Sequence, residues 1–309
     1  MFLNLDKRIR CPSVLLPIIL HIAKFNIIIV QPLISIVIPT KNSANTLDDC
    51  LQSIINQTYS KLEIVIVDSQ STDDTLDIAR KYSAMIVETQ WGLLGARFLG
   101  FKASKGDYIL YLDSDQILVH SNVLECSLPM FSNNDMLCLA EESSRTDSLL
   151  QKLIAADRKL VNKYWERNID PLSGFFIPRF YKRCILNAVF EELDIVHRMH
   201  EIGINEDCLI YYHAHRLSHS SRIGVVSNAL LHMDLSSLIG YFHKNYIYGQ
   251  HMKSLVENSL YKKLILRNVR FRKGLTFDIQ SLQSVVLRIL KIVPFLVGLA
   301  IGRTMPYTK

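Results

Sequence analysis

Two aspartates, Asp113 and Asp115, follow directly on a run of five apolar residues at 108–112. A run of this length and composition indicates a buried strand, and in an open α/β sheet ligands bind at the carboxyl ends of the strands. Two carboxylates at such an edge offer oxygen ligands to a hard divalent cation, with room left for water and substrate phosphates. For this short motif alone, the alternative is that Asp113 caps the next helix and Asp115 is solvated, because small acidic motifs are common by chance.

Polar side chains also follow two earlier apolar runs. Residues 34–39 and 62–67 read as strands, and the chain continues from them into Thr40-Lys41-Asn42 and into Asp68. Because parallel strands end at the same edge of a sheet, these residues and the two aspartates are expected to surround one crevice. With Arg97 on a helix between them, the set predicts a nucleotide pocket. The sequence has neither G-x-G-x-x-G nor a Walker-type glycine loop, so a metal ion and an arginine are expected to hold the phosphates.

Strand-like and helix-like segments alternate through the first half of the chain. Strands are predicted over 34–39, 62–67, 84–87 and 108–112, and helices over about 45–55, 71–82 and 93–103. This alternation predicts an α/β fold with a Rossmann-like, doubly wound, mostly parallel sheet. A helix over 121–131, a strand over 136–140 and a helix over 147–165 follow. Asp157, Arg158 and Lys159 on the last helix are expected to face solvent.

Four linked motifs resemble family 2 glycosyltransferases of the GT-A fold, of the membrane-associated type. They are Ile36–Asn42, Val65–Asp73, Gly95-Ala96-Arg97 and Leu112–Asp115, and the resemblance extends over about 33–249. It implies the GT-A fold with a helical C-terminal appendage. It also implies a nucleotide-sugar donor, Mg²⁺ or Mn²⁺ as cofactor, and a glycan or lipid-linked acceptor.

The same resemblance implies which residues bind the donor. Pro39 and Lys41 would line the base pocket, Asp68 would contact the nucleoside, Arg97 the base or diphosphate, and Asp113 the ribose. The donor base and sugar stay open, because three positions depart from the common pattern. These are Lys41 in place of an aromatic residue, Gln70 in place of glycine and Phe98 in place of asparagine.

The metal ligands implied by the resemblance are Asp113, Asp115 and His232. His232 follows an apolar run, as does the histidine that completes the metal site after the last core strand of these enzymes. The alternative is a structural histidine. Three further histidines, His213, His215 and His219, are expected at the surface, because no acid nearby completes a zinc site with them.

A general base is required, because an acceptor hydroxyl loses a proton as it attacks the anomeric carbon opposite the leaving diphosphate. Glu206-Asp207 resembles the pair that opens a helix beside the acceptor in these enzymes, where the aspartate is the base. The helix dipole favours a charged carboxylate at this end. The alternative is simple capping by Asn205, with two acids in the first turn.

Cations around 179–183 are candidates for the acceptor side. Arg179, Lys182 and Arg183 are expected to meet an acceptor phosphate, with ordinary surface charge as the alternative. The chain carries a formal net charge of +6, and the segment 244–273 holds eight Lys or Arg against one acid. This basic segment favours a membrane surface or a lipid phosphate as partner. No nucleic-acid partner is expected, because no nucleic-acid module is recognisable.

Two apolar segments raise the question of a membrane. Residues 14–30 are interrupted by Pro17, His21, Lys24 and Asn26 and are expected to be neither a signal peptide nor a span. Residues 285–301 are interrupted by cations and fit either a helix lying in the membrane interface or one packed on the protein's own core. Six scattered cysteines suit reduced thiols.

These features predict three regions in 309 residues. They are an apolar extension (1–32), the glycosyltransferase domain (33–234) and a basic, apolar helical region that associates with membrane (235–309). The prediction is an inverting, metal-assisted glycosyltransferase acting at the cytoplasmic face of the cell membrane, peripheral or monotopic. The alternatives are a sugar nucleotidyltransferase, which normally needs a glycine-rich loop absent here, and a non-catalytic membrane-bound protein that binds nucleotide sugars.

Overall fold

The computed structural model describes residues 31–165, 177–193, 206–218, 223–256 and 275–301. Strands and helices alternate in its first half, as predicted. The elements are β1 (Ile34–Thr40), α1 (Ala44–Ile55), β2 (Leu62–Asp68), α2 (Thr75–Lys81), β3 (Met85–Glu88), α3 (Leu93–Ala103) and β4 (Tyr108–Tyr111). Each lies within a few residues of its predicted range, because continuous apolar runs and helical spacing are strong local signals.

The second half is less regular. Its elements are β5 (Gln116–Leu118), α4 (Val123–Ser127), the 3₁₀ helix η1 (Leu128–Ser132), β6 (Met136–Ser143), α5 (Leu149–Trp165), β7 (Phe180–Lys182), α6 (Arg183–Glu192), α8 (Glu206–Leu217) and β8 (Ile223–His232). The helix predicted over 121–131 divides into α4 and η1, with Pro129 in the first turn of η1. Proline lacks the N–H that a continuing α-helix would use there.

All these strands form one mixed sheet in the described residues, in the order β3-β2-β1-β4-β7-β6-β8-β5. The pairs β1–β2, β1–β4, β2–β3 and β6–β8 are parallel, and β4–β7, β6–β7 and β5–β8 are antiparallel. In this register Thr40 lies beside Asp68. The predicted α/β fold with a mostly parallel sheet is therefore confirmed, and the polar ends of β1, β2 and β4 share one edge.

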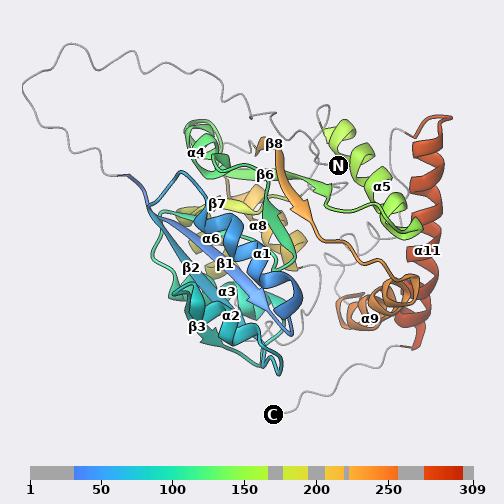
Figure 1. Ribbon diagram of the computed structural model, residues 1–309, viewed down its shortest axis with the longest axis horizontal. Coiled ribbons are helices and arrows are strands. Elements are labelled where there is room, and N and C mark those ends of the chain that lie inside the picture. The colour runs from blue at the N-terminus through green and yellow to red at the C-terminus, as the bar shows by residue number, and fades with distance from the viewer. Residues whose placement is uncertain (1–30, 166–176, 194–205, 219–222, 257–274, 302–309) are drawn as a thin grey trace, which may run out of the picture.

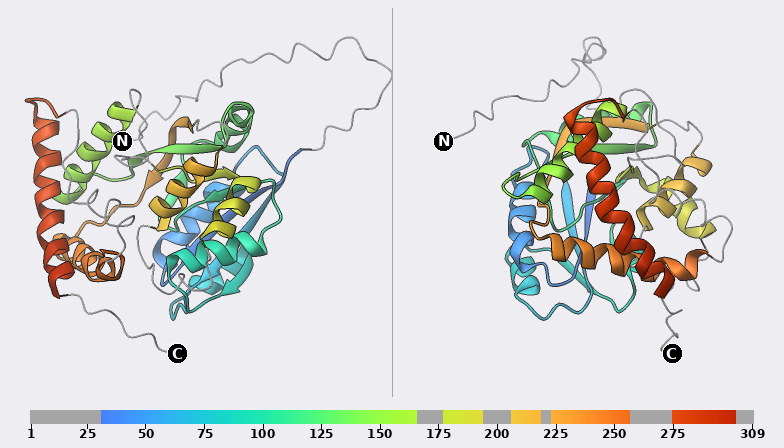
Figure 2. Two further views of the ribbon diagram at one scale, coloured as in Figure 1. Left: turned by 180° about the vertical axis from the view of Figure 1, so that it is seen from behind. Right: turned by 90° about the vertical axis from the view of Figure 1, so that its right-hand side faces the viewer.

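Helices cover both faces of the sheet (Figures 1 and 2). On one face α1 and α2 bury Leu47, Leu51 and Ala79 against β1 and β2. On the other face α3, α6 and α8 form a second core, to which Phe101 and Leu209 contribute. Because both faces are covered, the central strands are apolar on both sides, with β1 buried along its whole length.

Two further helices, α9 (Leu238–Val256) and α11 (Ile279–Ile301), form a layer with α5 beside the sheet (Figure 1). They cross closely, as the right-hand view of Figure 2 shows. A Cβ atom on Gly249 would lie 2.0 Å from the carbonyl oxygen of Phe295, and one on Gly298 equally close to that of Tyr246. Only glycine permits backbones to approach so closely, so these two positions fix how α9 and α11 pack.

The amphipathicity of α11 is inverted with respect to that of an ordinary surface helix. Its inward face buries the polar residues Ser281, Ser284 and Arg288 alongside Leu287 and Phe295. Its outward face exposes apolar residues: Ile279, Leu282, Val286, Ile289, Val293, Leu296, Val297 and Ile301. Within the described residues, α11 is the helix long and apolar enough to cross a membrane. The predicted segment 14–30 lies outside the described residues.

The cluster around Asp157 corrects a prediction. Asp157 and Arg158 were expected to face solvent, but Asp157 is buried and accepts a 2.6 Å hydrogen bond from the Ser284 hydroxyl. Arg288 Nε lies 3.9 Å from the same carboxylate oxygen. The pattern of α5 cannot reveal this, because the burying surface comes from α11, more than 100 residues later in the chain.

Two smaller expectations also differ. His213 is buried rather than exposed, with its Nδ1 atom 3.1 Å from Glu192. Cys50, Cys138, Cys184 and Cys208 carry free thiols, as expected, whereas Cys126 is disulfide-bonded. His219 lies outside the described residues.

Candidate active site

At the shared edge of β1 and β2, Asp68 organises the loop that follows it. The side chain is fully buried and accepts hydrogen bonds from the Thr40 hydroxyl (2.8 Å) and from the backbone N–H and hydroxyl of Ser71 (2.8 and 2.6 Å). Gln70, which lies between Asp68 and Ser71 in the chain, has a φ of 59°. Such a left-handed backbone favours glycine, which explains why glycine is frequent there in the resembling enzymes. Asp68 therefore shapes the loop, and the expected direct contact with a nucleoside is not supported.

The other two residues expected at the base pocket differ in access. Lys41 is exposed, just after β1. Pro39 is buried inside β1. The loop between β1 and α1 is tied to the loop after β2, because the Asn42 N–H donates to the Ser71 hydroxyl at 2.8 Å and the Asn42 side chain accepts from the Thr72 N–H at 2.8 Å. Lys41 thus remains the expected base-pocket residue that a ligand can reach.

Arg97 corrects a prediction, because it does not face an open pocket. Its side chain is 2% exposed, and its Nη2 and Nε atoms each lie 2.8 Å from a carboxylate, on Asp113 and on Glu206 respectively. The guanidinium also lies 5.2 Å from the ring centre of Tyr111. Arg97 therefore joins the end of β4 to the start of α8, and contact with a donor base or diphosphate is not possible in this arrangement.

Asp113 is held by two arginines. Its Oδ1 atom pairs with Arg97, and its Oδ2 atom lies 2.8 Å from Arg179 Nη1. Burial by itself would raise the pKa of Asp113, but the charges of Arg179 and Arg97 outweigh burial and hold that pKa well below its usual range. The carboxylate is thus charged, and both of its oxygens are occupied. The metal-ligand role expected of Asp113 is not supported by this geometry.

Asp115 and His232 face each other across the pairing of β5 with β8. Gln116 is opposite His232 in this register, and His232 Nε2 lies 3.6 Å from Asp115 Oδ1. The other ring nitrogen, Nδ1, lies 3.2 Å from Asp234, which in turn pairs with Arg158 at 2.7 Å. A carboxylate behind a histidine orients the ring and raises its basicity as a ligand.

These residues fit a divalent cation. The described part of the chain holds no cluster of three or more metal-ligating side chains, but Mg²⁺ and Mn²⁺ are often held by one or two protein groups together with substrate phosphates. Burial raises the pKa of the Asp115 carboxyl, an effect that Asp113 adds to and His232 opposes. A cation between Asp115 and His232 would remove that electrostatic cost.

Glu206 and Asp207, in the first turn of α8, have different surroundings. Glu206 is 3% exposed and pairs with Arg97, so the catalytic role expected of it is not supported. The side chain of Asp207 is 22% exposed and lines the pocket, with Arg179 Nη2 3.8 Å away. Asp207 also accepts a hydrogen bond from the N–H of Cys208. Asn205, the expected cap, lies outside the described residues.

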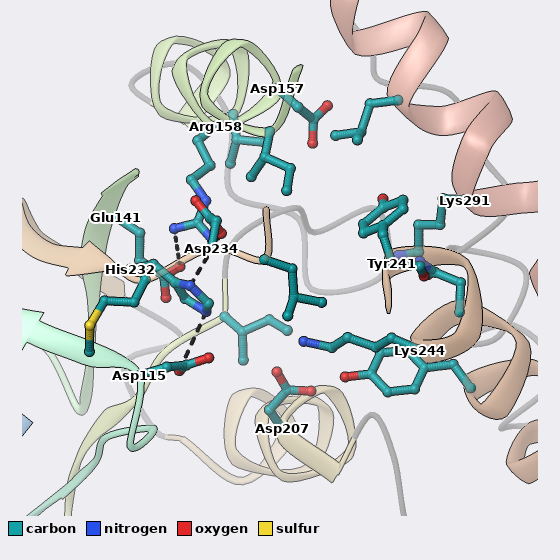
Figure 3. A pocket seen from close by; sticks show the side chains of 18 of the residues that line it. Asp115, Glu141, Asp157, Arg158, Asp207, His232, Asp234, Tyr241, Lys244 and Lys291 are labelled. Carbon is teal, nitrogen blue, oxygen red and sulfur yellow. Dashed lines mark hydrogen bonds and ion pairs between the residues drawn. The ribbon is translucent and has the colours of Figure 1, made fainter. Parts of the chain in front are cut away.

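Asp115, His232 and Asp207 open into one pocket of about 470 Å³ (Figure 3). The sheet edge and α8 form one side of it, and α5, α9 and α11 form the other. Tyr241 and Lys244 of α9 and Lys291 of α11 reach in from that second side (Figure 3). The volume lies in the range of small-molecule sites.

The sequence profile of glycosyl transferase family 2 matches residues 35–153. Residues 35–153 form a family 2 glycosyltransferase domain.

Two relatives and one solved structure illustrate the likeness. An uncharacterised glycosyltransferase of Haemophilus influenzae is 31% identical over 114 residues, which cover 35% of this chain and 45% of that protein. The poly(ribitol-phosphate) beta-glucosyltransferase of Bacillus spizizenii is 40% identical over 95 residues, covering 28% of this chain and 15% of the relative. The crystal structure of S. aureus TarS 1-349 in complex with UDP-GlcNAc superposes with a TM-score of 0.52 at 16% identity, covering 90% of this chain and 93% of that one.

The chain therefore spans less than half the length of these two curated relatives. The structural likeness covers 90% of this chain and so extends beyond the matched domain. It confirms the GT-A-type fold expected from the four motifs.

The prediction that Lys182 and Arg183 contact the acceptor is wrong, because neither residue lines the pocket. Arg183 donates a 2.8 Å hydrogen bond to the Ser104 hydroxyl and another bond to the Gly106 carbonyl, and Lys182 pairs with Asp135 at 2.8 Å. Lys182 lies opposite Tyr108, at the start of β4. Strand β7 runs antiparallel to β4. The chain therefore passes from Arg179, at the site, to Lys182 and Arg183, at the opposite edge of the sheet.

Sequence reasoning missed the residues that complete the pocket of this family 2 domain. They are Glu141, Arg158, Asp234, Tyr241, Lys244 and Lys291. Asp234 had a usable signal, because it stands two positions after the suspected ligand His232, and a carboxylate that orients the ring is common behind metal-binding histidines. The lysines had none, since basic residues in a basic segment are not distinguished by sequence.

Proposed function

We propose that this chain is an inverting glycosyltransferase that moves a sugar from a nucleotide-sugar donor to an acceptor hydroxyl, assisted by Mg²⁺ or Mn²⁺. The observation that carries the proposal is the convergence of Asp207 with Asp115 and His232 on one pocket (Figure 3). One carboxylate is suited to proton abstraction, and the other belongs to a cation site. The relative TarS, whose structure holds UDP-GlcNAc, supports a donor of this class.

In the proposed step, the acceptor oxygen attacks the anomeric carbon of the donor sugar and forms the new C–O bond. The bond from that carbon to the diphosphate oxygen breaks on the opposite face, and its electron pair leaves with the nucleoside diphosphate. Asp207 takes the hydroxyl proton, as a general base. Arg179 lies between Asp113 and Asp207 and directs positive charge toward the centre of the site. Preorganised charge of this kind stabilises the transition state.

Asp115 and His232 would hold the cation, with Asp234 keeping the His232 ring in place. When bound, the cation supplies charge neutralisation for the departing diphosphate. Asp113 contributes indirectly, because it holds Arg179 in the site and is itself held by Arg97.

We further propose that the outward face of α11 rests on a membrane surface, at its cytoplasmic side. A face of eight exposed apolar residues is suited to the interfacial layer of a bilayer. The inward face opposes a spanning orientation, because Arg288 and Asp157 are buried together between α11 and α5. A helix attached to its own domain along its polar side lies on a membrane rather than through it.

The donor class is tested by thermal unfolding with a panel of nucleoside diphosphates, each with and without Mn²⁺. A bound ligand raises the melting temperature, so we expect a Mn²⁺-dependent rise for at least one base. Asp115→Asn should lose that rise, whereas Asp77→Asn, on the exposed side of α2, should keep it. A panel with no metal-dependent rise for the wild type would refute the donor proposal.

The membrane proposal is tested by sedimentation with anionic phosphatidylglycerol vesicles. Leu296→Glu and Val293→Glu place charges on the outward face of α11 and should reduce the bound fraction severalfold. Ile55→Glu is the matched control, because Ile55 is a comparably exposed apolar residue on α1. Equal vesicle binding by the wild type and all three variants would refute the membrane proposal.

A further inference from the structure

The pocket has a cationic wall opposite its catalytic edge. Lys244 extends from α9 toward the region above Asp207, and Lys291 of α11 lines the same side (Figure 3). The charge of Asp115 acts on Lys244 across the pocket without an ion pair between the two residues. The two lysines approach the pocket from the C-terminal layer, on the side opposite Asp115 and His232 (Figure 3).

The arginines of the pocket already have carboxylate partners. Arg158 pairs with Asp234, Arg179 with Asp113, and Arg288 contacts Asp157. Lys244 differs from them, because no described carboxylate lies within ion-pair distance of its ammonium group. Its described neighbour is the uncharged Tyr248, with the ring centre 5.8 Å away and a side-chain hydrogen bond between the two residues. The side chain is solvent-accessible. Its charge is therefore available to a ligand.

The charge of Lys244 is stable at neutral pH. Burial lowers the pKa of the ammonium group, but Tyr248 and the carboxylates of Asp115 and Asp113 raise it by more, to above its ordinary value. Asp115 lies at the opposite side of the pocket (Figure 3), where it attracts Lys244 without closing an ion pair.

The two lysines are held in a fixed relation by the helices that carry them. Gly249 and Gly298 bring α9 and α11 into backbone contact. Phe295 is buried in this contact and joins the main core of the domain. Binding a ligand between the lysines therefore requires little reorganisation of the backbone, which favours affinity.

We propose that Lys244 and Lys291 form a subsite for a phosphate group on the acceptor, so that the sugar is transferred to a hydroxyl close to a phosphate monoester or diester. The assignment rests on the proposed transferase function, because it takes Asp207 as the place of the reacting hydroxyl. Lysine is a point-charge donor suited to phosphate oxygens. Tyr241, on the same side of the pocket, adds a hydroxyl to the wall.

The arrangement has a consequence for acceptor choice. A neutral sugar in this pocket would leave Lys244 without a counter-charge and would gain nothing from it. An acceptor with a phosphate satisfies the lysine and is thereby positioned with a hydroxyl at Asp207. The subsite therefore selects phosphate-bearing acceptors over neutral ones of the same size.

Isothermal titration with glycerol 1-phosphate and with glycerol tests the subsite on the full chain. The protein is first saturated with Mn²⁺ and the nucleoside diphosphate that raises its melting temperature, so that the probe does not enter the donor site. We expect glycerol 1-phosphate to bind and glycerol not to bind. Lys244→Gln and Lys291→Gln should each weaken that binding about tenfold, the loss typical for one charge-assisted hydrogen bond.

Two controls separate a local effect from others. Lys159→Gln removes the same charge from the exposed side of α5 and should leave binding unchanged. Lys244→Arg keeps the charge and should retain most of the affinity, which excludes a folding defect at this position. Equal binding of glycerol and its phosphate, or wild-type affinity in the Lys244→Gln/Lys291→Gln double variant, would overturn the subsite.

The source of the phosphate is distinguished by a second arm with phosphatidic acid in phosphatidylcholine vesicles. Vesicle binding that depends on both lysines assigns the subsite to a membrane-borne phosphate, whereas a dependence seen only with glycerol 1-phosphate assigns it to a water-soluble acceptor. A separate result would refute the proposed transferase function, namely that no nucleoside diphosphate raises the melting temperature in the presence of Mn²⁺. In that case the titration is run without nucleotide, and the lysine dependence is still measured.

Discussion

Replacing Arg97 by methionine tests how the two halves of the active site are joined. The substitution keeps the length of the side chain and removes a charge that is 2% exposed. Asp113 would retain Arg179 as a partner, but Glu206, which is 4% exposed at its side chain, would lose the described cation that pairs with it. Removing one partner of a buried ion pair typically costs about 3–5 kcal/mol. We expect a loss of that size in the free energy of unfolding at neutral pH.

The loss should depend on pH with a definite sign. Burial raises the pKa of Glu206, with Arg97 opposing that rise. Without Arg97 the pKa of folded Glu206 rises further, so the folded state holds a proton that the unfolded state releases above its ordinary value of about 4.5. Stability then falls as pH rises through the interval between the two values. In the wild type burial already raises the pKa of Glu206 to about 7, so the loss in Arg97→Met should be smallest in mild acid and should grow as the pH rises above about 7.

Urea unfolding followed by tryptophan fluorescence at pH 5.5 and pH 8.5 measures both effects. Arg80→Met is the matched control, because the Arg80–Asp77 pair is 61% and 71% exposed and such pairs contribute about 0–1 kcal/mol. The double variant Arg97→Met/Glu206→Leu should recover part of the loss, since it removes the stranded carboxylate. A loss below about 1 kcal/mol in Arg97→Met, equal to that of the control, would refute the bridging role.

Three further outcomes are expected. Asp207→Asn should keep Mn²⁺-dependent nucleotide binding and lower transfer by about 10²–10⁴-fold, the usual contribution of general-base catalysis; wild-type transfer rates would remove Asp207 from the mechanism. Asp115→Ala should lose both transfer and the metal-dependent part of nucleotide binding, measured by calorimetry with and without Mn²⁺; full binding would exclude Asp115 as a ligand. Gly298→Val should lower the melting temperature, because its side chain would meet the Tyr246 carbonyl and overpacking costs about 1–3 kcal/mol; an unchanged value would show that α9 and α11 do not need this contact.

The sheet and the order of the motifs could be predicted from the sequence. Strands β1, β2 and β4 are mostly apolar runs. Thr40 and Asp68 end β1 and β2, and Asp113 follows two residues after β4, so that these polar residues mark the edge of the site. Local periodicity and the strand-end rule suffice for such elements. The position of Asp207 was also predictable, because an acidic pair opening a helix is visible in the chain itself.

The partners of the charged residues could not be predicted in the same way. Arg97 reads as a donor-binding residue in sequence, and only the packing of α3 against α8 shows that Glu206 covers it. Arg179 and Arg183 are four positions apart and read alike, yet the antiparallel pairing of β7 sends them to opposite edges of the sheet. Contacts between distant segments of the chain decide these roles, and a local sequence pattern cannot predict such contacts.

The inverted amphipathicity of α11 bears on how the protein can be produced. Shortening the chain before Ile279 would remove an apolar surface that invites aggregation in water, and it would look like a route to a soluble catalytic fragment. The same cut would leave the Asp157 carboxylate without Ser284 and Arg288, uncover the inner side of α5 and take away the Lys291 wall of the pocket. A detergent or nanodisc preparation of the full chain is therefore the form in which activity should be sought.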